Sequence, residues 1–373
     1  MVFWLALFAT GYSYFFYPML LLVLPGRVPH IGLAASLPRV SLIITARNES
    51  LRIQAKLENA LAVDYPADRF EIIVASDASD DGMDELVYGY SGRGVQLIRA
   101  GVRKGKEYAQ SLAIAAASGE ILVFSDVATQ IPADSIHKIV SRFSDPVVGA
   151  VSSEDRFVSQ DGQIAGEGVY VRYEMWLRAL ESRVNSLVGL SGSFFAARKQ
   201  VCSDWDITVP SDFNTALNCA RLGYVAVSAP DVLGYYADLK DPAREYQRKV
   251  RTVLRGMAGL FGRLDVMNPW RYRFFAVQVI SHKLMRWLVP WALLLLLICT
   301  ALLWDASVYY VIFLWMQLVF YVAALLGWRS VVLRRLLICR LPFFFMQANI
   351  AVAQAGISYL LGRRVTLWEP SRR

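Results

Sequence analysis

Val40-Ser-Leu-Ile-Ile-Thr45 is an apolar run rich in β-branched residues, and a helical stretch near residues 51–61 and the run Glu71-Ile-Ile-Val-Ala75 follow it. The alternation continues with a predicted strand at 95–98, a small-residue helix at 107–117 and a third apolar strand, Glu120-Ile-Leu-Val-Phe-Ser125. Short apolar runs that alternate with helical stretches predict a parallel sheet with helices on both faces. The sequence therefore predicts an α/β fold for this part of the chain.

The chain as a whole is too apolar for an ordinary soluble domain, because 55% of its 373 residues are hydrophobic. No charge occurs in residues 1–26, 287–304 or 306–328, and each run is long enough to cross a hydrocarbon core. A fourth uncharged run, 341–362, contains a proline and three amide side chains. These polar groups suit a re-entrant or interfacial helix as well as a full span.

These runs divide the chain into six predicted parts. They are an anchor at 1–26, a cytosolic domain at 27–264, interfacial amphipathic helices at 265–286, transmembrane helices at 287–304 and 306–328, and a third hydrophobic or re-entrant segment with a basic tail at 329–373. The first apolar run is longer than the hydrophobic part of a secretory signal and has no basic leader, so it predicts a retained anchor.

Basic residues flank the apolar runs on the side of the soluble domain, with Arg27 and Arg39 after the first run and Lys283 and Arg286 before the second. This bias predicts an integral inner or plasma membrane protein whose soluble domain faces the cytoplasm. The basic tail favours the same side, which conflicts with a full fourth span. The net charge of +8 is concentrated beside the spans, so it predicts contact with anionic membrane lipids rather than nucleic acid. The four cysteines show no paired metal-ligand spacing.

Two acids follow apolar strands directly: Asp77 after the second strand and Asp126 after the third. Ligands of open parallel sheets collect at the carboxyl ends of strands. Asp77 begins the turn Asp77-Ala-Ser-Asp-Asp-Gly82, which is either a solvated turn that caps the next helix or a turn whose carboxylate accepts a hydrogen bond from a pyrimidine base. At the end of a buried strand, Asp126 needs a partner, and a divalent cation that bridges two phosphates is one candidate.

Three further segments carry a functional and a structural interpretation each. The segment 101–106 resembles a phosphate-binding P-loop but is one residue short, so Lys106 is expected either to contact a diphosphate from the start of a helix or to lie in a solvated turn. Asp212 either caps an apolar helix or acts as a general base. Arg248 and Arg251 share a helix face that either lies on a membrane surface or closes over a diphosphate.

In this order, the segments resemble the membrane-bound family 2 glycosyltransferases that make polysaccharides, cellulose, hyaluronan or glycolipids. Residues 40–49 resemble the opening strand and Asn-Glu turn, 71–82 the base-binding segment, 105–106 the phosphate segment, Asp126 the first acid of Asp-x-Asp, 191–193 the acceptor loop, and 211–212 the segment with the catalytic base. The resemblance implies donor-binding, acceptor-binding and catalytic residues. They are Thr45, Glu49, Asp77, Lys106, Asp126, Arg248 and Arg251 for the donor, Ser191, Gly192 and Ser193 for the acceptor, and Asp212 as the base.

The resemblance further implies a GT-A type fold and Mg²⁺ or Mn²⁺ bound by Asp126. Two motifs depart from the family pattern: Ala128 replaces the last acid of Asp-x-Asp, and Arg248-Lys-Val-Arg251-Thr252 stands where processive members carry Gln-x-x-Arg-Trp. The first departure leaves the use of a metal open.

The expected function is inverting transfer of a sugar from a nucleotide sugar, with UDP as the expected nucleotide, to a polysaccharide or lipid-linked acceptor at the cytoplasmic membrane face. One alternative is the loading of a single sugar onto a lipid carrier or lipid head group. Another is a catalytically silent, nucleotide-binding subunit of a polysaccharide synthesis complex. The expected partners are the nucleotide sugar, a saccharide or lipid-linked acceptor and membrane lipids, with a second copy or polysaccharide-export proteins as further candidates.

Overall fold

The computed structural model describes residues 1–28, 36–158, 169–237 and 242–364. The chain forms two compact units. The sheet unit comprises Leu24–Lys240 and Gly259–Ala276, and the helical unit comprises Met1–Val23, Asp241–Ala258 and Val277–Arg364.

The sheet unit is built on one seven-stranded sheet in the order β3-β2-β1-β4-β6-β5-β7. Its strands are β1 Val40–Ala46, β2 Phe70–Ser76, β3 Val95–Arg99, β4 Ile121–Asp126, β5 Val148–Val158, β6 Phe194–Arg198 and β7 Val225–Ala237. Strands β1 to β4 pair in parallel, and β6 is antiparallel to both of its neighbours, β4 and β5. The prediction of an α/β fold with a mostly parallel sheet is confirmed.

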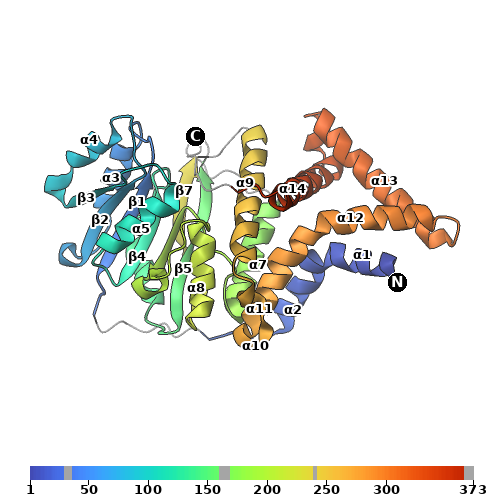
Figure 1. The fold of residues 1–373 in the computed structure, drawn as a ribbon, viewed down its shortest axis with the longest axis horizontal. Coiled ribbons are helices and arrows are strands. Elements are labelled where there is room, and N and C mark those ends of the chain that lie inside the picture. Colours follow the sequence, from blue (N-terminus) through green and yellow to red (C-terminus); the bar gives the residue numbers. More distant parts are fainter. Residues whose placement is uncertain (29–35, 159–168, 238–241, 365–373) are drawn as a thin grey trace. The chain divides into compact units, whose positions relative to one another are not determined.

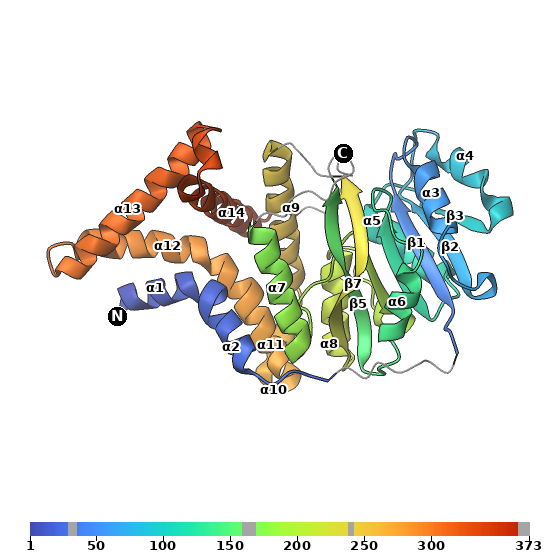
Figure 2. The same ribbon diagram turned by 180° about the vertical axis from the view of Figure 1, so that it is seen from behind.

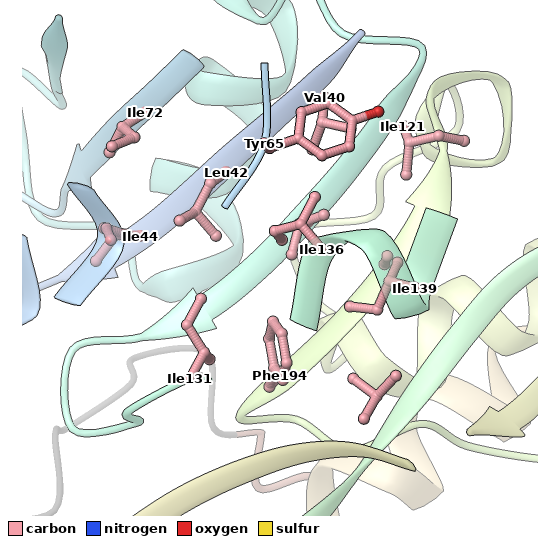
Figure 3. Packing of buried hydrophobic residues seen from close by; sticks show 14 of the residues in the cluster. Val40, Leu42, Ile44, Tyr65, Ile72, Ile121, Ile131, Ile136, Ile139 and Phe194 are labelled. Carbon is pink, nitrogen blue, oxygen red and sulfur yellow. The ribbon is translucent and has the colours of Figure 1, made fainter. Parts of the chain in front are cut away.

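Helices cover both faces of this sheet (Figures 1 and 2). They are α3 Ile53–Leu61, α4 Met83–Tyr88, α5 Lys106–Ala116, α6 Ser135–Arg142, α7 Val169–Val184 and α8 Ser211–Arg221. Side chains alternate along β1, so Leu42 and Ile44 pack with α3 and α6 in one core, whereas Ile43 packs with α5 in the other. Figure 3 shows the first of these cores, with Leu42 and Ile44 of β1 and Ile136 and Ile139 of α6 among its labelled side chains.

The helical unit contains the apolar segments. Its helices are α1 Val2–Gly11, α2 Tyr17–Val23, α12 Met285–Leu302, α13 Val308–Arg329 and α14 Leu337–Leu360. Most of α9 Pro242–Phe261 also belongs to this unit, as does the end of α11 Phe274–Val279, which leads into α12. In the described part of the chain, four helices are long and apolar enough to cross a membrane: Val2–Val23, Phe274–Leu302, Val308–Arg329 and Leu337–Leu360. Within this unit, Phe3 packs edge to face on Tyr310 and Phe313.

The second and fourth of these helices differ from the charge-free runs in the sequence. The second helix starts at Phe274, whereas the uncharged run starts at Trp287. Lys283 and Arg286 interrupt the uncharged run but not the helix, which passes through a π-helical turn at Ile280–Leu284. In the fourth run the structure has one 24-residue helix, Leu337–Leu360, with Pro342 inside its first turns. Length and composition therefore suit this helix to a full span.

A substitution of Gly149 in β5 would test the packing between the sheet and α8. A Cβ atom added there would lie 2.5 Å from Tyr224 Cβ and 2.9 Å from Cys219 Sγ. Neither neighbour has room to move in a packed core, so we expect Gly149→Ala to lower the free energy of unfolding by about 1–3 kcal/mol. A lowered thermal midpoint of the purified protein in detergent would show this.

The matched control is Gly92→Ala, because nothing lies within 4 Å of a Cβ atom at that position. An equal loss of stability in both variants would contradict the packing argument.

Candidate active site

The parallel register of the sheet brings the ends of β1, β2 and β4 to one edge. Thr45 in β1 is the partner of Ala75 in β2 and of Asp126 in β4. Asp77 follows the last residue of β2, so both acids that the sequence analysis selected lie at this carboxyl edge. The Oγ1 atom of Thr45 is buried beside them and has no hydrogen-bond partner among the described residues.

Asp77 is fully buried and holds the loop before α5. Its Oδ1 atom accepts hydrogen bonds from the backbone N–H groups of Lys104, at 2.9 Å, and Gly105, at 3.1 Å, and its Oδ2 atom accepts one from Gly105 at 3.0 Å. The carboxylate thus fixes the backbone that leads into Lys106. The contact with a nucleotide base stays a prediction, and the structure adds a role in shaping the phosphate segment.

The turns after β1 and β2 are tied together by polar contacts. Arg47 donates to the Asp77 carbonyl at 3.2 Å and to Asp80 Oδ2 at 3.0 Å, and Asn48 donates to Asp80 Oδ1 at 2.7 Å. Asn48 and Ala78 both have positive φ angles, 53° and 54°. A positive φ is uncommon for residues other than glycine, so the contacts between the turns maintain a strained backbone next to the candidate site.

Lys106 joins three segments that are far apart in the sequence. Its Nζ atom lies 2.5 Å from Asp126 Oδ1 and donates to the Gly192 carbonyl at 2.9 Å. The residue opens α5 and is 7% exposed, so its ammonium group is fixed at the edge of the sheet rather than solvated. Because Lys106 is buried and paired, the structural interpretation as a solvated basic turn does not describe it.

Glu49 and Lys56 are two further buried ionisable residues near this edge of the sheet. Burial raises the pKa of Glu49, while its salt bridge to Arg52, at 2.5 Å, opposes the rise. Lys56 in α3 is fully buried and donates to Ser125 Oγ at 2.8 Å and to the Thr129 carbonyl. Burial lowers the pKa of Lys56 to about 7, against the attraction of Asp126. Lys56 is not among the residues predicted from the sequence, although a lysine on the apolar face of a predicted helix is a visible signal.

Asp212 lies in the first turn of α8, and its carboxylate faces Gly192. A Cβ atom added at Gly192 would be 3.6 Å from Asp212 Oδ2, and the Leu190 N–H donates to the Asp212 carbonyl at 3.3 Å. The N-terminus of α8 has no side-chain cap, so the structural interpretation of Asp212 as a capping residue is wrong. In the described part of the chain, no hydrogen bond to the Asp212 carboxylate is found, which leaves it available as a base.

The loop that contains Gly192 is anchored by an acid that the sequence analysis missed. Ser191 Oγ and Ser193 Oγ each donate to Asp155 Oδ1 at 2.6 Å. Burial raises the pKa of Asp155, while the two serine hydrogen bonds oppose the rise. The Ser191 N–H also donates to Ser152 Oγ at 2.8 Å. Asp155 lies in an irregular stretch of charged residues in β5, so no periodicity in the sequence distinguished it.

Arg248 and Arg251 lie on α9, in the part of that helix that belongs to the helical unit. Their spacing of three residues places them on one side of α9, as the sequence indicated. Their contact with a donor diphosphate stays a prediction.

The resemblance implied a divalent cation at Asp126, and the surrounding residues fit such an ion poorly. The Oδ1 atom of Asp126 is engaged by Lys106, and Ala128 offers no side-chain ligand. Among the described residues, no three His, Cys, Asp or Glu side chains form a group that could hold a metal ion. Mg²⁺ and Mn²⁺ prefer several oxygen ligands, whereas at this edge Asp126 is paired with Lys106 and both oxygens of the Asp77 carboxylate accept backbone N–H groups.

The loop-holding role of Asp77 predicts the effect of its removal. Asp77→Ala would leave the partly buried N–H of Lys104 and the buried N–H of Gly105 without acceptors, at a cost of about 1–3 kcal/mol for the buried group. We expect a lower thermal midpoint and faster hydrogen exchange at both amides, measured by mass spectrometry. The control is Asp68→Ala, since the Asp68 side chain is 80% exposed and its ion pair with Arg69, at 3.8 Å, contributes little. Equal losses in both variants would contradict this role.

The low pKa of Lys56 predicts how stability depends on pH. The pKa is about 7 in the folded protein and 10.5 for an ordinary lysine, so between these values the unfolded chain binds a proton that the folded chain has released. Stability therefore rises as the pH rises through this range. We expect the thermal midpoint of the wild type to rise more between pH 7 and pH 9.5 than that of Lys56→Met. The exposed Lys138→Met is the control, and equal slopes for Lys56→Met and the wild type would contradict the assignment.

Comparison with known proteins identifies a domain within the sheet unit. Residues 41–204 match the model of Glycosyl transferase family 2. The chain is 30% identical over 118 residues to a beta-monoglucosyldiacylglycerol synthase of Synechocystis sp., covering 31% of this chain and 25% of that protein. It is 28% identical over 176 residues to a poly-beta-1,6-N-acetyl-D-glucosamine synthase of Staphylococcus epidermidis, covering 45% of this chain and 42% of that protein. The matches thus span well under half of these relatives.

Two further comparisons cover more of the chain. Glycosyltransferase AglE of Haloferax volcanii is 25% identical over 232 residues, which are 60% of this chain and 73% of AglE. The solved mannosyltransferase PcManGT of Pyrobaculum calidifontis, in complex with GDP-Man and Mn²⁺, superposes with a TM-score of 0.73 at 23% identity, covering 98% of this chain and 100% of that one. At this identity the superposition shows the fold. Residues 41–204 therefore form a glycosyl transferase family 2 domain, and the superposition gives the chain a GT-A type fold.

Proposed function

We propose that this protein is an inverting glycosyltransferase that moves a sugar from a nucleotide sugar to a saccharide or lipid-linked acceptor. One observation carries the proposal: Lys106 connects the Asp126 carboxylate to the Gly192 loop, against which Asp212 lies. A cation for the diphosphate and a carboxylate for the acceptor thus share one edge of the sheet.

The donor half of the proposed site is formed by the ends of β1, β2 and β4 and the start of α5. Lys106 supplies a fixed positive charge for the diphosphate, and the N-terminus of α5 favours an anion at the same place. Thr45, at the end of β1 and in register with Asp126, is a further donor residue of the proposal. We propose a uridine nucleotide as donor, with the Asp77 turn beside its base.

Asp212 supplies the base for a single displacement. It accepts the proton of an acceptor hydroxyl group while the acceptor oxygen bonds to the anomeric carbon of the donor sugar. The bond between that carbon and the phosphate oxygen breaks, and its electron pair leaves with the nucleoside diphosphate. Attack from the face opposite the leaving group inverts the anomeric centre. A second, nucleophilic carboxylate next to the sugar, as a double displacement requires, was not assigned from the sequence.

We also propose that the reaction takes place at the cytoplasmic face of a membrane. The four candidate membrane helices support an integral protein, and the basic residues beside them support the cytoplasmic side for the sheet unit. A nucleotide sugar is available on that side, and a lipid-linked acceptor would be held at the bilayer surface.

The relatives favour two classes of acceptor. One is named for the synthesis of a glucosyldiacylglycerol and another for that of a poly-N-acetylglucosamine. A single transfer to a lipid head group is the second candidate function, because only three candidate membrane helices follow the catalytic domain in the described chain, which is few for a polymer channel. The length of the product after incubation with donor and membrane lipids distinguishes the two.

The base role of Asp212 is tested with Asp212→Asn, which removes the proton acceptor and keeps the shape of the side chain. We expect turnover of a reactive donor, found in a panel of UDP-glucose, UDP-N-acetylglucosamine and GDP-mannose, to fall by about 10²- to 10⁴-fold. The affinity for the matching nucleoside diphosphate, measured by calorimetry, should stay within about threefold, because Asp212 lies beside the acceptor loop.

Asp204→Asn is the matched control, since Asp204 is 66% exposed and pairs with Arg221 outside the site. Near wild-type turnover by Asp212→Asn would remove the proposed base. Absence of both transfer and donor hydrolysis for the wild type, with every donor and with or without metal, would instead favour a catalytically silent subunit.

A further inference from the structure

Departure of a nucleoside diphosphate creates negative charge that the enzyme has to stabilise. A metal site built on Asp-x-Asp meets this need with a divalent cation held by carboxylates. In this chain the second acidic position is Ala128, and Asp126 forms an ion pair with Lys106 at 2.5 Å. Another group therefore has to carry the positive charge at the end of β4.

Lys106 is placed to carry this positive charge. Its ammonium group is held between Asp126 Oδ1 and the Gly192 carbonyl, at 2.5 and 2.9 Å, and its side chain is 9% exposed. The backbone before it is fixed by Asp77, so the position of the charge is set before any ligand binds. A preorganised charge in a site with little water stabilises a developing anion without the cost of reorientation.

A second lysine lies on the other side of Asp126. Lys56 is fully buried, donates to Ser125 Oγ at 2.8 Å and is attracted by Asp126. Of the other acids at this edge, Glu49 is paired with Arg52 at 2.5 Å, and both carboxylate oxygens of Asp77 accept backbone N–H groups. A divalent ion entering here would be repelled by Lys106 and, beyond Asp126, would have to break these contacts to gain a carboxylate ligand, so the electrostatics oppose its binding.

We propose that the Lys106 ammonium group takes the place of a divalent cation, and that transfer proceeds without a metal ion. This inference rests on the proposed function. In the transfer step the acceptor proton passes to Asp212, the acceptor oxygen bonds to the anomeric carbon, and the electron pair of the broken bond goes to the diphosphate. Lys106 donates hydrogen bonds to the diphosphate oxygens and balances their added charge.

The first experiment compares metal-depleted and metal-loaded enzyme. The full chain, purified in detergent, is passed over a chelating resin, and its metal content is checked by mass spectrometry. Turnover of the reactive donor is then measured in excess EDTA and in Mn²⁺ or Mg²⁺. We expect the rates to agree within about threefold. Loss of more than about tenfold in EDTA, restored by Mn²⁺, would overturn the inference and leave the proposed function intact.

The second experiment tests the lysine itself. Lys106→Gln keeps hydrogen-bond donors and removes the charge, so we expect turnover in EDTA to fall by about 10²- to 10³-fold, as when one donor to a developing anion is removed. Binding of UDP and GDP by calorimetry, also in EDTA, should weaken for whichever nucleotide the wild type binds. The control is Lys138→Gln, because Lys138 is 38% exposed on α6 and pairs with Asp134.

Wild-type turnover and nucleotide affinity in Lys106→Gln would contradict the role of the lysine, even if the wild type needs no metal. Absence of turnover in both buffers, with every donor, would contradict the proposed function, and the inference would fail with it. A thermal midpoint of Lys106→Gln close to that of the wild type shows that the variant is folded.

Discussion

The ion pair between Lys106 and Asp126 is the interaction on which the candidate site depends. It joins the start of α5 to the end of β4, and through the Gly192 carbonyl it reaches the loop beside Asp212. Two residues with opposite charge at this depth are stable only because each has its partner. The same pair occupies the carboxylate that a metal ion would use, so one contact determines both the shape of the site and its charge.

The polar groups around this pair show how a parallel sheet accommodates charge at its edge. Asp77 is fully buried but accepts backbone hydrogen bonds, and Glu49 is paired with Arg52. Asp155 is held by two serine hydroxyl groups. Asp77 and Asp155 each fix a loop of the candidate site through these hydrogen bonds.

The helical unit adds a constraint of another kind. Its four candidate membrane helices bury little of their surface within the protein, between 17% and 33% of each apolar window. Large exposed apolar side chains such as Trp315 and Leu325 suit a bilayer better than water, in agreement with a protein held at a membrane.

The sequence by itself determined the parallel strands, the acids at their ends and the apolar helices, because these follow from local patterns: apolar runs of strand length, charges at run ends and long uncharged segments. It also selected Asp77, Lys106, Asp126 and Asp212 as a set. Only the tertiary structure decided which of these side chains meet, since Lys106 contacts Gly192, 86 positions away, across strands whose order no local pattern specifies. For the same reason Asp155 and the full length of the Phe274–Leu302 helix came from the structure: burial and helix continuation depend on neighbours distant in the chain.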